Sequence, residues 1–366
     1  MLLAARHGAK EYEHKAVTEK THSKQAGDWF RWKQFLSKVG IENDPFLQAT
    51  DPKDSFESSD YIESFMYMYR FNYFGTKIGG TIGHDRINQS ISNIASRFTA
   101  EGYINPTHDR SGNRKVTIKK QLKAYRDKDP AVVRQSALPA TVFEFLFKDH
   151  SSPLNSAIGQ LTSGALFYAM RSCEYSSTEG KPKTKLLTLG DIIFYKNGKP
   201  IKSDRQNADD VKITFQIQKS GVKDEPAIRR KAPKGHPLCP VRIWASIVDR
   251  IQSYKGSDND TPVNAILVND EIRLIKASTI RETIRKAVQA LGEENLGIKA
   301  SEVGTHSIRT SCATMLFLQG MDPENIKMAG RWNSDQFLKY IRKNTTIANM
   351  TEKISTVSNR TIQTLN

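Results

Sequence analysis

The stretch GTHSIRTSCATMLFLQGMDPENIKMAGRWNSDQFLKYIR, residues 304–342, holds the densest group of unusual side chains in the chain. Its first half predicts a helix in which His306 and Arg309 are three residues apart and which stops at Gly320. A spacing of three places both side chains on one face, and the positive end of the helix dipole adds to their charge. The pair is a candidate anion-binding site, although an exposed helix start would show the same residues.

The second half of this stretch predicts two short helices. The first lies between Asp322, the expected N-cap, and Gly330. Trp332 follows, and a helix expected over 335–342 then carries Tyr340. Taken alone, Tyr340 has the pattern of a core aromatic residue. These residues therefore indicate chemistry only in combination with the rest of the stretch.

Two positions further upstream extend the pattern. Arg171, in FYAMRSCEY, precedes Glu174 by three residues. Lys219, in FQIQKSGVK, lies at the tip of a hairpin that follows the alternating strand expected at 211–218. Lys223 lies in the same loop, so either lysine is a candidate for a basic side chain at that tip.

In this order the residues resemble the conserved boxes of the tyrosine recombinases, the phage-integrase and Cre-like family. The string H-x-x-R, a helix that ends in glycine, A-G-R-W and K-Y-I-R resembles the second box, and Arg171 resembles the first catalytic arginine. The ending GRWNSDQFLKYIR is also similar to recombinases of eukaryotic mobile elements of the Crypton or DIRS kind. The specific motifs lie within 171–342, while the two-domain outline of the family covers the whole chain.

The resemblance implies an enzyme that cleaves and rejoins duplex DNA without metal, ATP or another cofactor. Tyr340 would attack the scissile phosphorus and form a 3′-phosphotyrosine intermediate. Arg171 and Arg309 would hold the phosphate by forked, charge-assisted hydrogen bonds. Lys219 would protonate the departing 5′-oxygen, and His306 would act as a general acid or base.

Trp332 and Glu174 complete the implied catalytic site. Trp332 occupies the place of a histidine in many relatives, and its indole N–H donates to a phosphate oxygen without shuttling a proton. Glu174 is expected to orient Arg171 or His306. Tyr340 falls eight residues after Trp332, one fewer than in most relatives. No other tyrosine follows, so the nucleophile is Tyr340 or the chain cannot cleave.

The hydropathy pattern predicts a mainly α fold with an all-helical domain before an α+β catalytic domain that contains a small antiparallel sheet. Two prolines within 129–140 break the helical period and predict a linker there. By resemblance the first domain is a SAM-like core-binding domain that clamps DNA. The expected parts are a flexible arm, the core-binding domain, the linker, the catalytic domain and a docking tail, over residues 1–20, 21–128, 129–140, 141–342 and 343–366.

The charge of the chain indicates a polyanionic partner. Lys and Arg total 55 against 39 Asp and Glu, a net charge of +16, and nucleic acid is the usual partner for such an excess. An ordinary basic protein is the alternative. The candidate DNA contacts lie on the basic face of a helix expected at 114–126, in the hairpin loop or beside the main motif: Lys115, Lys119, Lys123, Arg126, Lys223 and Arg331.

Several classes of protein are excluded by the same sequence. No apolar run predicts a membrane span, and the opening residues do not predict a secretory signal. The three cysteines are far apart, so neither a disulfide framework nor a metal site is expected. We expect an intracellular protein, nuclear in a eukaryotic host and otherwise cytoplasmic or associated with the nucleoid.

The assembly and two other functions stay open at this point. A weak amphipathic pattern in 343–366 resembles the family's C-terminal helix, which docks on a neighbouring protomer and would give a tetramer on two DNA sites. Packing of this tail onto its own domain is the alternative. A type IB topoisomerase-like enzyme would use the same nucleophile as a monomer, and a domesticated or inactive recombinase would only bind DNA.

Overall fold

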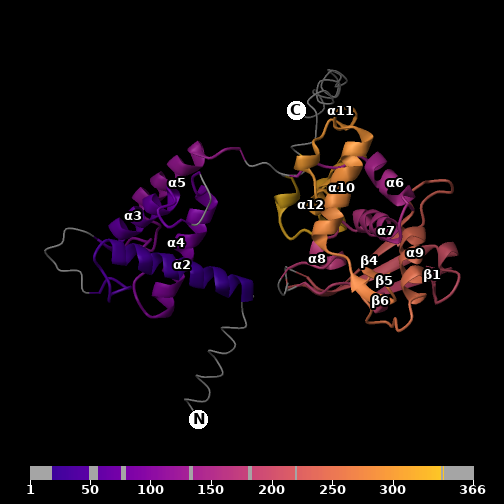
Figure 1. Cartoon of the computed structure of the whole chain (residues 1–366), viewed down its shortest axis with the longest axis horizontal. Helices are drawn as coiled ribbons and strands as arrows, with labels where there is room; N and C mark the ends of the chain where they lie inside the picture. The colour runs from indigo at the N-terminus through magenta and orange to yellow at the C-terminus, as the bar shows by residue number, and fades with distance from the viewer. Residues whose placement is uncertain are drawn as a thin grey trace, which may run out of the picture. The chain divides into compact units, whose positions relative to one another are not determined.

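The structure is a computed structural model that describes residues 19–48, 57–75, 80–131, 135–179, 184–218, 221–338 and 341. The chain divides into two compact units, 1–132 and 133–366, and the division falls inside the stretch predicted as a linker. Figure 1 shows helices in both units, and among the described residues the strands belong to the second unit alone. The predicted mainly helical fold with a small antiparallel sheet is confirmed.

The described residues of the first unit form four helices, as expected for the predicted all-helical domain. Their apolar positions, spaced by three and four residues, converge on one core that is rich in aromatic rings. Trp32 and Phe65, for example, meet edge to face with ring centroids 5.6 Å apart. The helices are α2 (Glu19–Lys38), α3 (Ser58–Arg70), α4 (His84–Ala100) and α5 (Val116–Lys128).

Asp129, expected at the start of the linker, is bound to this first unit. Its carboxylate accepts a hydrogen bond of 2.7 Å from the His84 backbone N–H and another from Arg70. Burial raises the pKa of the Asp129 carboxyl, but the bonds from His84 and Arg70 outweigh it and hold the pKa below its usual 3.8. The carboxylate thus ties the end of α5 to α3 and α4.

We expect Asp129→Asn to lower the free energy of unfolding of the first unit by about 1–2 kcal/mol at pH 7. A carboxyl with a lowered folded pKa stabilises above its unfolded pKa, and this stabilisation is lost as the pH falls through the folded value. The difference from wild type should therefore shrink as the pH falls below 3.8. Hydrogen exchange measured by mass spectrometry separates the two units, and a deficit that persists unchanged in acid would contradict the prediction.

Residues 135–138, also expected in the linker, are bound to the second unit. The Leu138 N–H donates to Ser311 Oγ at 2.7 Å, and Gln135 Oε1 accepts from the Ser307 N–H at 3.1 Å. Ser307 and Ser311 both belong to α12 (Thr305–Leu318). Asp129 and residues 135–138 of the predicted linker are therefore parts of the first and second unit, respectively.

In its described residues, the second unit combines eight α-helices and four 3₁₀ turns with two antiparallel sheets. Its helices are α6 (Ala140–Lys148), α7 (Pro153–Phe167), α8 (Ser172–Tyr175), α9 (Pro240–Gln252), α10 (Ala277–Leu291), α11 (Glu293–Leu296), α12, α13 (Pro323–Ala329) and the 3₁₀ turn η4 (Asp335–Phe337), beside three further 3₁₀ turns. The larger sheet has the order β2-β1-β3-β4, from β1 (Ile192–Lys196), β2 (Lys199–Ile201), β3 (Asp210–Ile217) and β4 (Lys223–Arg230). A hairpin of β5 (Ala265–Val268) and β6 (Glu271–Leu274) forms the second sheet.

Helix α7 is the centre of the second unit and is buried over most of its length. Gly159 allows α6 to approach, because a Cβ atom there would lie 2.0 Å from the Leu146 carbonyl oxygen. Helices α9 and α12 also pack against α7. In Figure 1 the strands gather at one end of this unit and α6, α10 and α12 lie toward the other. The C-terminal end of α7 is thereby fixed between helices and sheet.

The predicted helices over 305–318 and 323–329 are confirmed, with the Asp322 side chain capping the second as expected. The helices α6, α8 and α11, the strand β2 and the β5–β6 hairpin were not predicted. The helix expected over 335–342 is described only as η4 at its start. Among the described residues, no helix is long and apolar enough to cross a membrane.

Candidate active site

The candidate site is built on the carbonyl groups that follow the last turn of α7. These groups have no partner within the helix, and the negative end of its dipole favours cations there. Three consecutive carbonyl oxygens each accept a hydrogen bond from a different arginine. The bonds are Arg229 Nε to Phe167 O at 2.7 Å, Arg331 Nη2 to Tyr168 O at 3.2 Å, and Arg309 Nη1 to Ala169 O.

The same three arginines, which we call the arginine bridge, also reach the end of α13. Arg229 Nη2 donates to the Ala329 carbonyl oxygen at 3.0 Å. Arg309 Nη2 donates to the Gly330 carbonyl oxygen at 2.8 Å, and Arg331 is the next residue in the chain. The bridge therefore joins the end of α7 to the end of α13, two segments far apart in the sequence.

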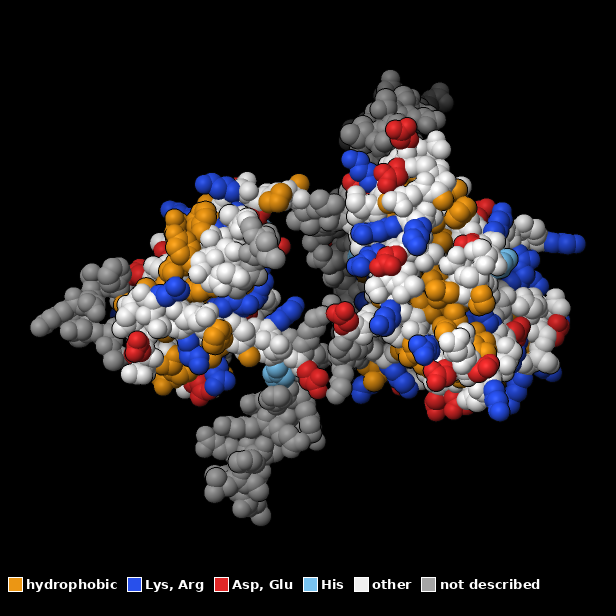
Figure 2. Space-filling view, in the orientation of Figure 1, with side chains coloured by type: hydrophobic (Ala, Val, Ile, Leu, Met, Phe, Trp, Pro, Cys, Tyr) orange, Lys and Arg blue, Asp and Glu red, His pale blue; other side chains and the backbone are white. Residues whose placement is uncertain are grey.

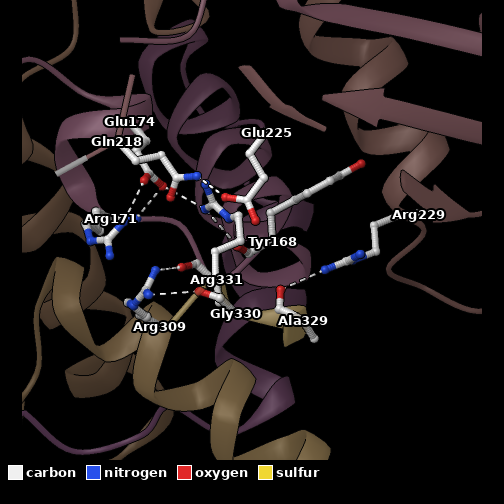
Figure 3. A network of polar contacts seen from close by, with 11 residues as sticks. Tyr168, Arg171, Glu174, Gln218, Glu225, Arg229, Arg309, Ala329, Gly330 and Arg331 are labelled. Atoms are coloured by element: carbon white, nitrogen blue, oxygen red, sulfur yellow. Dashed lines mark hydrogen bonds and ion pairs between the residues drawn. The ribbon is translucent and has the colours of Figure 1, made fainter. Parts of the chain in front are cut away.

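Arg171 enters the site directly after this turn of α7. Ala169 has a left-handed φ of +44°, which reverses the chain before Arg171 caps the short helix α8. The Arg171 backbone N–H and Nη1 both donate to the Glu174 carboxylate, at 2.9 and 3.1 Å. Glu174 is fully buried, whereas the Arg171 side chain is 22% exposed. Figure 3 shows Arg171 and Arg309 on the same side of this network.

The structure thus places Glu174 where the sequence analysis expected it, beside Arg171. It places Arg331 differently from the expectation that this arginine contacts DNA. The Arg331 side chain is buried, donates from Nη2 to Glu174 at 2.9 Å, and lies over the ring of Phe215 on β3. Burial lowers the pKa of the Arg331 guanidinium and Glu174 opposes that change. Because its charge is directed inward, Arg331 is corrected from a DNA contact to an internal ion-pair partner.

Trp332 packs against the guanidinium of Arg309. The centre of that guanidinium is 4.4 Å from the centroid of the indole ring, within the range of a cation–π contact. The ring lies so close to the backbone of Gly330 that a Cβ atom there would be 1.5 Å from it. Gly330 is thus the residue that admits Trp332 to its place beside Arg309.

We expect Gly330→Ala to lower the free energy of unfolding of the second unit by about 1–3 kcal/mol, because the methyl group overlaps the indole. Gly330 has a φ of −95°, so its backbone conformation suits alanine and the overlap alone causes the loss. Thermal unfolding checks this. Gly27→Ala is the control, since its Cβ atom meets only the Arg31 guanidinium at ordinary contact distance. Equal melting temperatures for the two variants would contradict the prediction.

His306 lies in the first turn of α12, three residues before Arg309. Its side chain is exposed, while that of Arg309 is buried. The start of this helix is well supported, because Ser307 Oγ accepts from the Gly304 N–H at 3.1 Å and Gln135 caps the Ser307 N–H. Both residues lie in the first half of α12, with the His306 side chain toward solvent and the Arg309 side chain inside the unit.

The predicted nucleophile Tyr340 and the predicted lysine Lys219 lie outside the described residues. The hairpin on which Lys219 was expected is present, formed by β3 and β4. Its alternative, Lys223, is the first residue of β4 and is exposed. Gln218, at the end of the hairpin, donates a hydrogen bond to Glu225 across the two strands. This hydrogen bond joins the two strands beside the loop that carries Lys219 in the sequence.

Sequence reasoning missed Arg229 and Glu225, which both belong to the network in Figure 3. The alternation of side chains between the two faces of β4 could have identified them. Glu225, Ala227 and Arg229 occupy its less exposed face, opposite Phe215, Ile213 and Val211 of β3. Two charged residues on the inward face of a strand require internal partners.

On the first unit, the structure brings together three of the four basic residues predicted as a stripe. Lys119, Lys123 and Arg126 line a hollow with His84 and Asn88. Lys115 instead precedes α5, and its Nζ donates to Ser59 Oγ at 2.7 Å and to Glu57. Figure 2 shows Lys and Arg side chains spread over both units on the face drawn.

The chain and its fold were compared with known proteins. No protein-family model matches the chain, and no curated protein matches it either. The XerH site-specific recombinase bound to its difH substrate, in a pre-cleavage complex, is similar with a TM-score of 0.51 and 12% identity, over 91% of this chain and 79% of that chain. The chain has the tyrosine recombinase fold.

Two further structures are similar to this tyrosine recombinase fold. The post-cleavage complex of XerH with a palindromic difH substrate has a TM-score of 0.50 at 12% identity, over 87% of this chain and 80% of that one. The Tn1549 transposon integrase in complex with transposon right end DNA has a TM-score of 0.49 at 14% identity, over 95% and 96%. The two XerH structures confirm, at the level of the fold, the resemblance stated from the sequence motifs.

Proposed function

We propose that this chain is a site-specific DNA recombinase or integrase that cleaves and rejoins duplex DNA through Tyr340. The observation that carries the proposal is the pairing of Arg171 and Arg309. These residues come from distant segments, and carbonyl and carboxylate partners fix each of them at the end of α7. Two fixed guanidinium groups match the non-bridging oxygens of a phosphodiester.

In the proposed reaction, the Tyr340 hydroxyl gives its proton to His306 as its oxygen attacks the scissile phosphorus, and the bond from phosphorus to the 5′-oxygen breaks as that oxygen takes a proton from Lys219 or Lys223. The bond energy is kept in a 3′-phosphotyrosine, so attack by a 5′-hydroxyl of another strand reverses the step and joins the strands. Arg171 and Arg309 stabilise the charge that develops on the phosphate in the transition state. His306 acts as general acid or base, and Trp332 donates its indole N–H to a phosphate oxygen.

The first unit is proposed to hold the duplex. Lys119, Lys123 and Arg126 form a basic group on and beside one face of α5, suited to contacts with backbone phosphates. The related XerH structures contain the recombinase bound to difH substrate. We further propose that the active assembly is a tetramer on two DNA sites, held by the C-terminal tail of each protomer.

The test selects the substrate and detects the covalent intermediate together. The full chain is incubated with a pool of nicked duplexes of random core sequence, and adducts that resist SDS are recovered and sequenced. The expected result is a recurrent sequence joined through its 3′-phosphate to Tyr340, identified by mass spectrometry of the linked peptide. Binding without an adduct would overturn the proposal in favour of a DNA-binding protein. Adducts without sequence preference that relax supercoils would favour a type IB topoisomerase-like enzyme.

A further inference from the structure

One buried carboxylate is shared by two arginines that belong to different parts of the site. Glu174 Oε1 accepts from Arg171 Nη1 at 3.1 Å. Its Oε2 accepts from the Arg171 backbone N–H and from Arg331 Nη2, both at 2.9 Å. Arg171 is partly exposed, whereas Glu174 and Arg331 are both at least 94% buried. Arg331 therefore holds the inner side of the carboxylate whose outer side faces Arg171.

The position of Arg331 is itself fixed by its surroundings. It follows Gly330 with a left-handed φ of +54°, donates to the Tyr168 carbonyl oxygen at 3.2 Å, and lies over the ring of Phe215. Its Nε and Nη1 are buried and have no hydrogen-bond partner among the residues that the structure describes. In that part of the chain, Glu174 is the carboxylate with which Arg331 forms an ion pair.

A buried arginine of this kind is costly, because its charge is removed from water and two of its donor atoms are left without partners. A buried ion pair is also weak evidence for stability, since apolar residues of similar volume often serve as well. A role in fixing the position of Glu174 beside Arg171 explains why a charged side chain is buried here. Without Arg331, the Oε2 atom of Glu174 would keep the Arg171 backbone as its partner and lose the contact on its inner side.

We propose that Arg331 is a positioning residue, which holds Glu174 against Arg171 and so fixes the direction in which the Arg171 guanidinium faces the DNA phosphate. The proposal rests on the function proposed above. Arg331 acts through Glu174 and does not touch the substrate. Because Arg331 follows Gly330, whose carbonyl binds Arg309, the same short segment sets the placement of both phosphate-binding arginines.

The first test measures the geometry without requiring cleavage. In the ¹⁵N-labelled full chain, the Nε–Hε signal of Arg171 is assigned by its loss in Arg171→Lys, and inorganic phosphate is titrated as the probe. Arg331→Met should shift this signal and weaken phosphate binding by about tenfold. Glu174→Gln should do the same, and the double variant should add little, because both changes remove one interaction. An unchanged Arg171 signal in Arg331→Met, or effects that multiply in the double variant, would overturn the proposal.

Two further variants separate positioning from packing. Arg250→Met is the control, because Arg250 is a half-buried arginine that is bonded to Gln160 and to the Ala265 carbonyl oxygen, and in the described part of the chain no hydrogen bond or ion pair joins it to Glu174. It should leave the Arg171 signal and phosphate affinity unchanged. Arg331→Lys keeps the charge and should recover part of the phosphate affinity. Equal losses in Arg331→Lys and Arg331→Met would show a packing role and overturn the proposal. If Arg331→Met does not fold, Arg331→Lys with and without Glu174→Gln gives the same comparison.

The second test uses the DNA site recovered by adduct selection. Single-turnover cleavage by Arg331→Met should fall about 100-fold, with the affinity for duplex DNA unchanged. If cleavage and melting temperature fall together to the same extent as in Arg250→Met, the positioning role is wrong. If the wild type forms no adduct, the proposed function fails while the phosphate titration still decides the role of Arg331.

Discussion

Replacing Tyr340 with phenylalanine should abolish the covalent protein–DNA adduct, with a loss of at least about 10⁴-fold in cleavage. The substitution removes the one oxygen that the proposed mechanism uses as a nucleophile and keeps the aromatic ring. Affinity for duplex DNA should stay within about twofold, because it depends mainly on contacts with backbone phosphates. Adduct formation on a nicked duplex and fluorescence anisotropy measure the two quantities separately.

Tyr195→Phe is the matched control for this experiment. Tyr195 lies on β1 of the same unit, where the Lys212 ammonium lies 5.8 Å from its ring. Its substitution should leave both the adduct and the DNA affinity unchanged. An adduct formed by Tyr340→Phe would mean that another residue is the nucleophile. A loss of DNA affinity in Tyr340→Phe would mean that the ring hydroxyl serves in binding and would weaken the proposed division of roles.

Arg309→Lys should slow cleavage by about 10²–10³-fold, although the positive charge is kept. Lysine presents one nitrogen in place of a planar fork, so it cannot bond the Ala169 and Gly330 carbonyl oxygens together and also face a phosphate. The free energy of unfolding should fall by about 1–3 kcal/mol, because a buried carbonyl loses its donor. Single-turnover cleavage and urea denaturation check the two effects.

Arg285→Lys tests whether the slower cleavage comes from lost stability alone. Arg285 also bonds two backbone carbonyl oxygens, those of Val303 at 3.1 Å and Ser301 at 3.3 Å, just before α12. We expect a loss of stability of the same kind and wild-type cleavage. If Arg285→Lys cleaves as slowly as Arg309→Lys, the special role of Arg309 is refuted.

Local sequence signals were enough to predict most of the elements that surround the site. The N-cap Asp322 and the stop at Gly330 define α13, and the Asn197–Gly198 pair, both with positive φ, forms the turn after β1. These features depend on neighbouring residues alone. Helix α6 was missed because the prolines before it mark a linker in the sequence, whereas contacts with α7 stabilise it.

The inward direction of Arg331 could not be read from the sequence. An arginine after a glycine turn is usually exposed, and its burial here depends on Glu174, which lies 157 residues earlier. The short interval between Trp332 and Tyr340 also concerns Arg331. Tyr340 is eight residues after Trp332 but nine after Arg331, so the interval typical of the family starts at the buried arginine. Register in a motif does not determine the direction of a side chain.

The contacts of residues 135–138 with α12 bear on how the second unit can be isolated. A truncated protein that begins at residue 140 would remove Gln135 and Leu138, which bond the Ser307 N–H and Ser311 Oγ of α12. Those bonds support the turn that carries His306 and the turn that carries Arg309. Any fragment intended for crystallisation or for assays of this unit should therefore start before Gln135. A fragment that begins at α6 would lose these two bonds to α12.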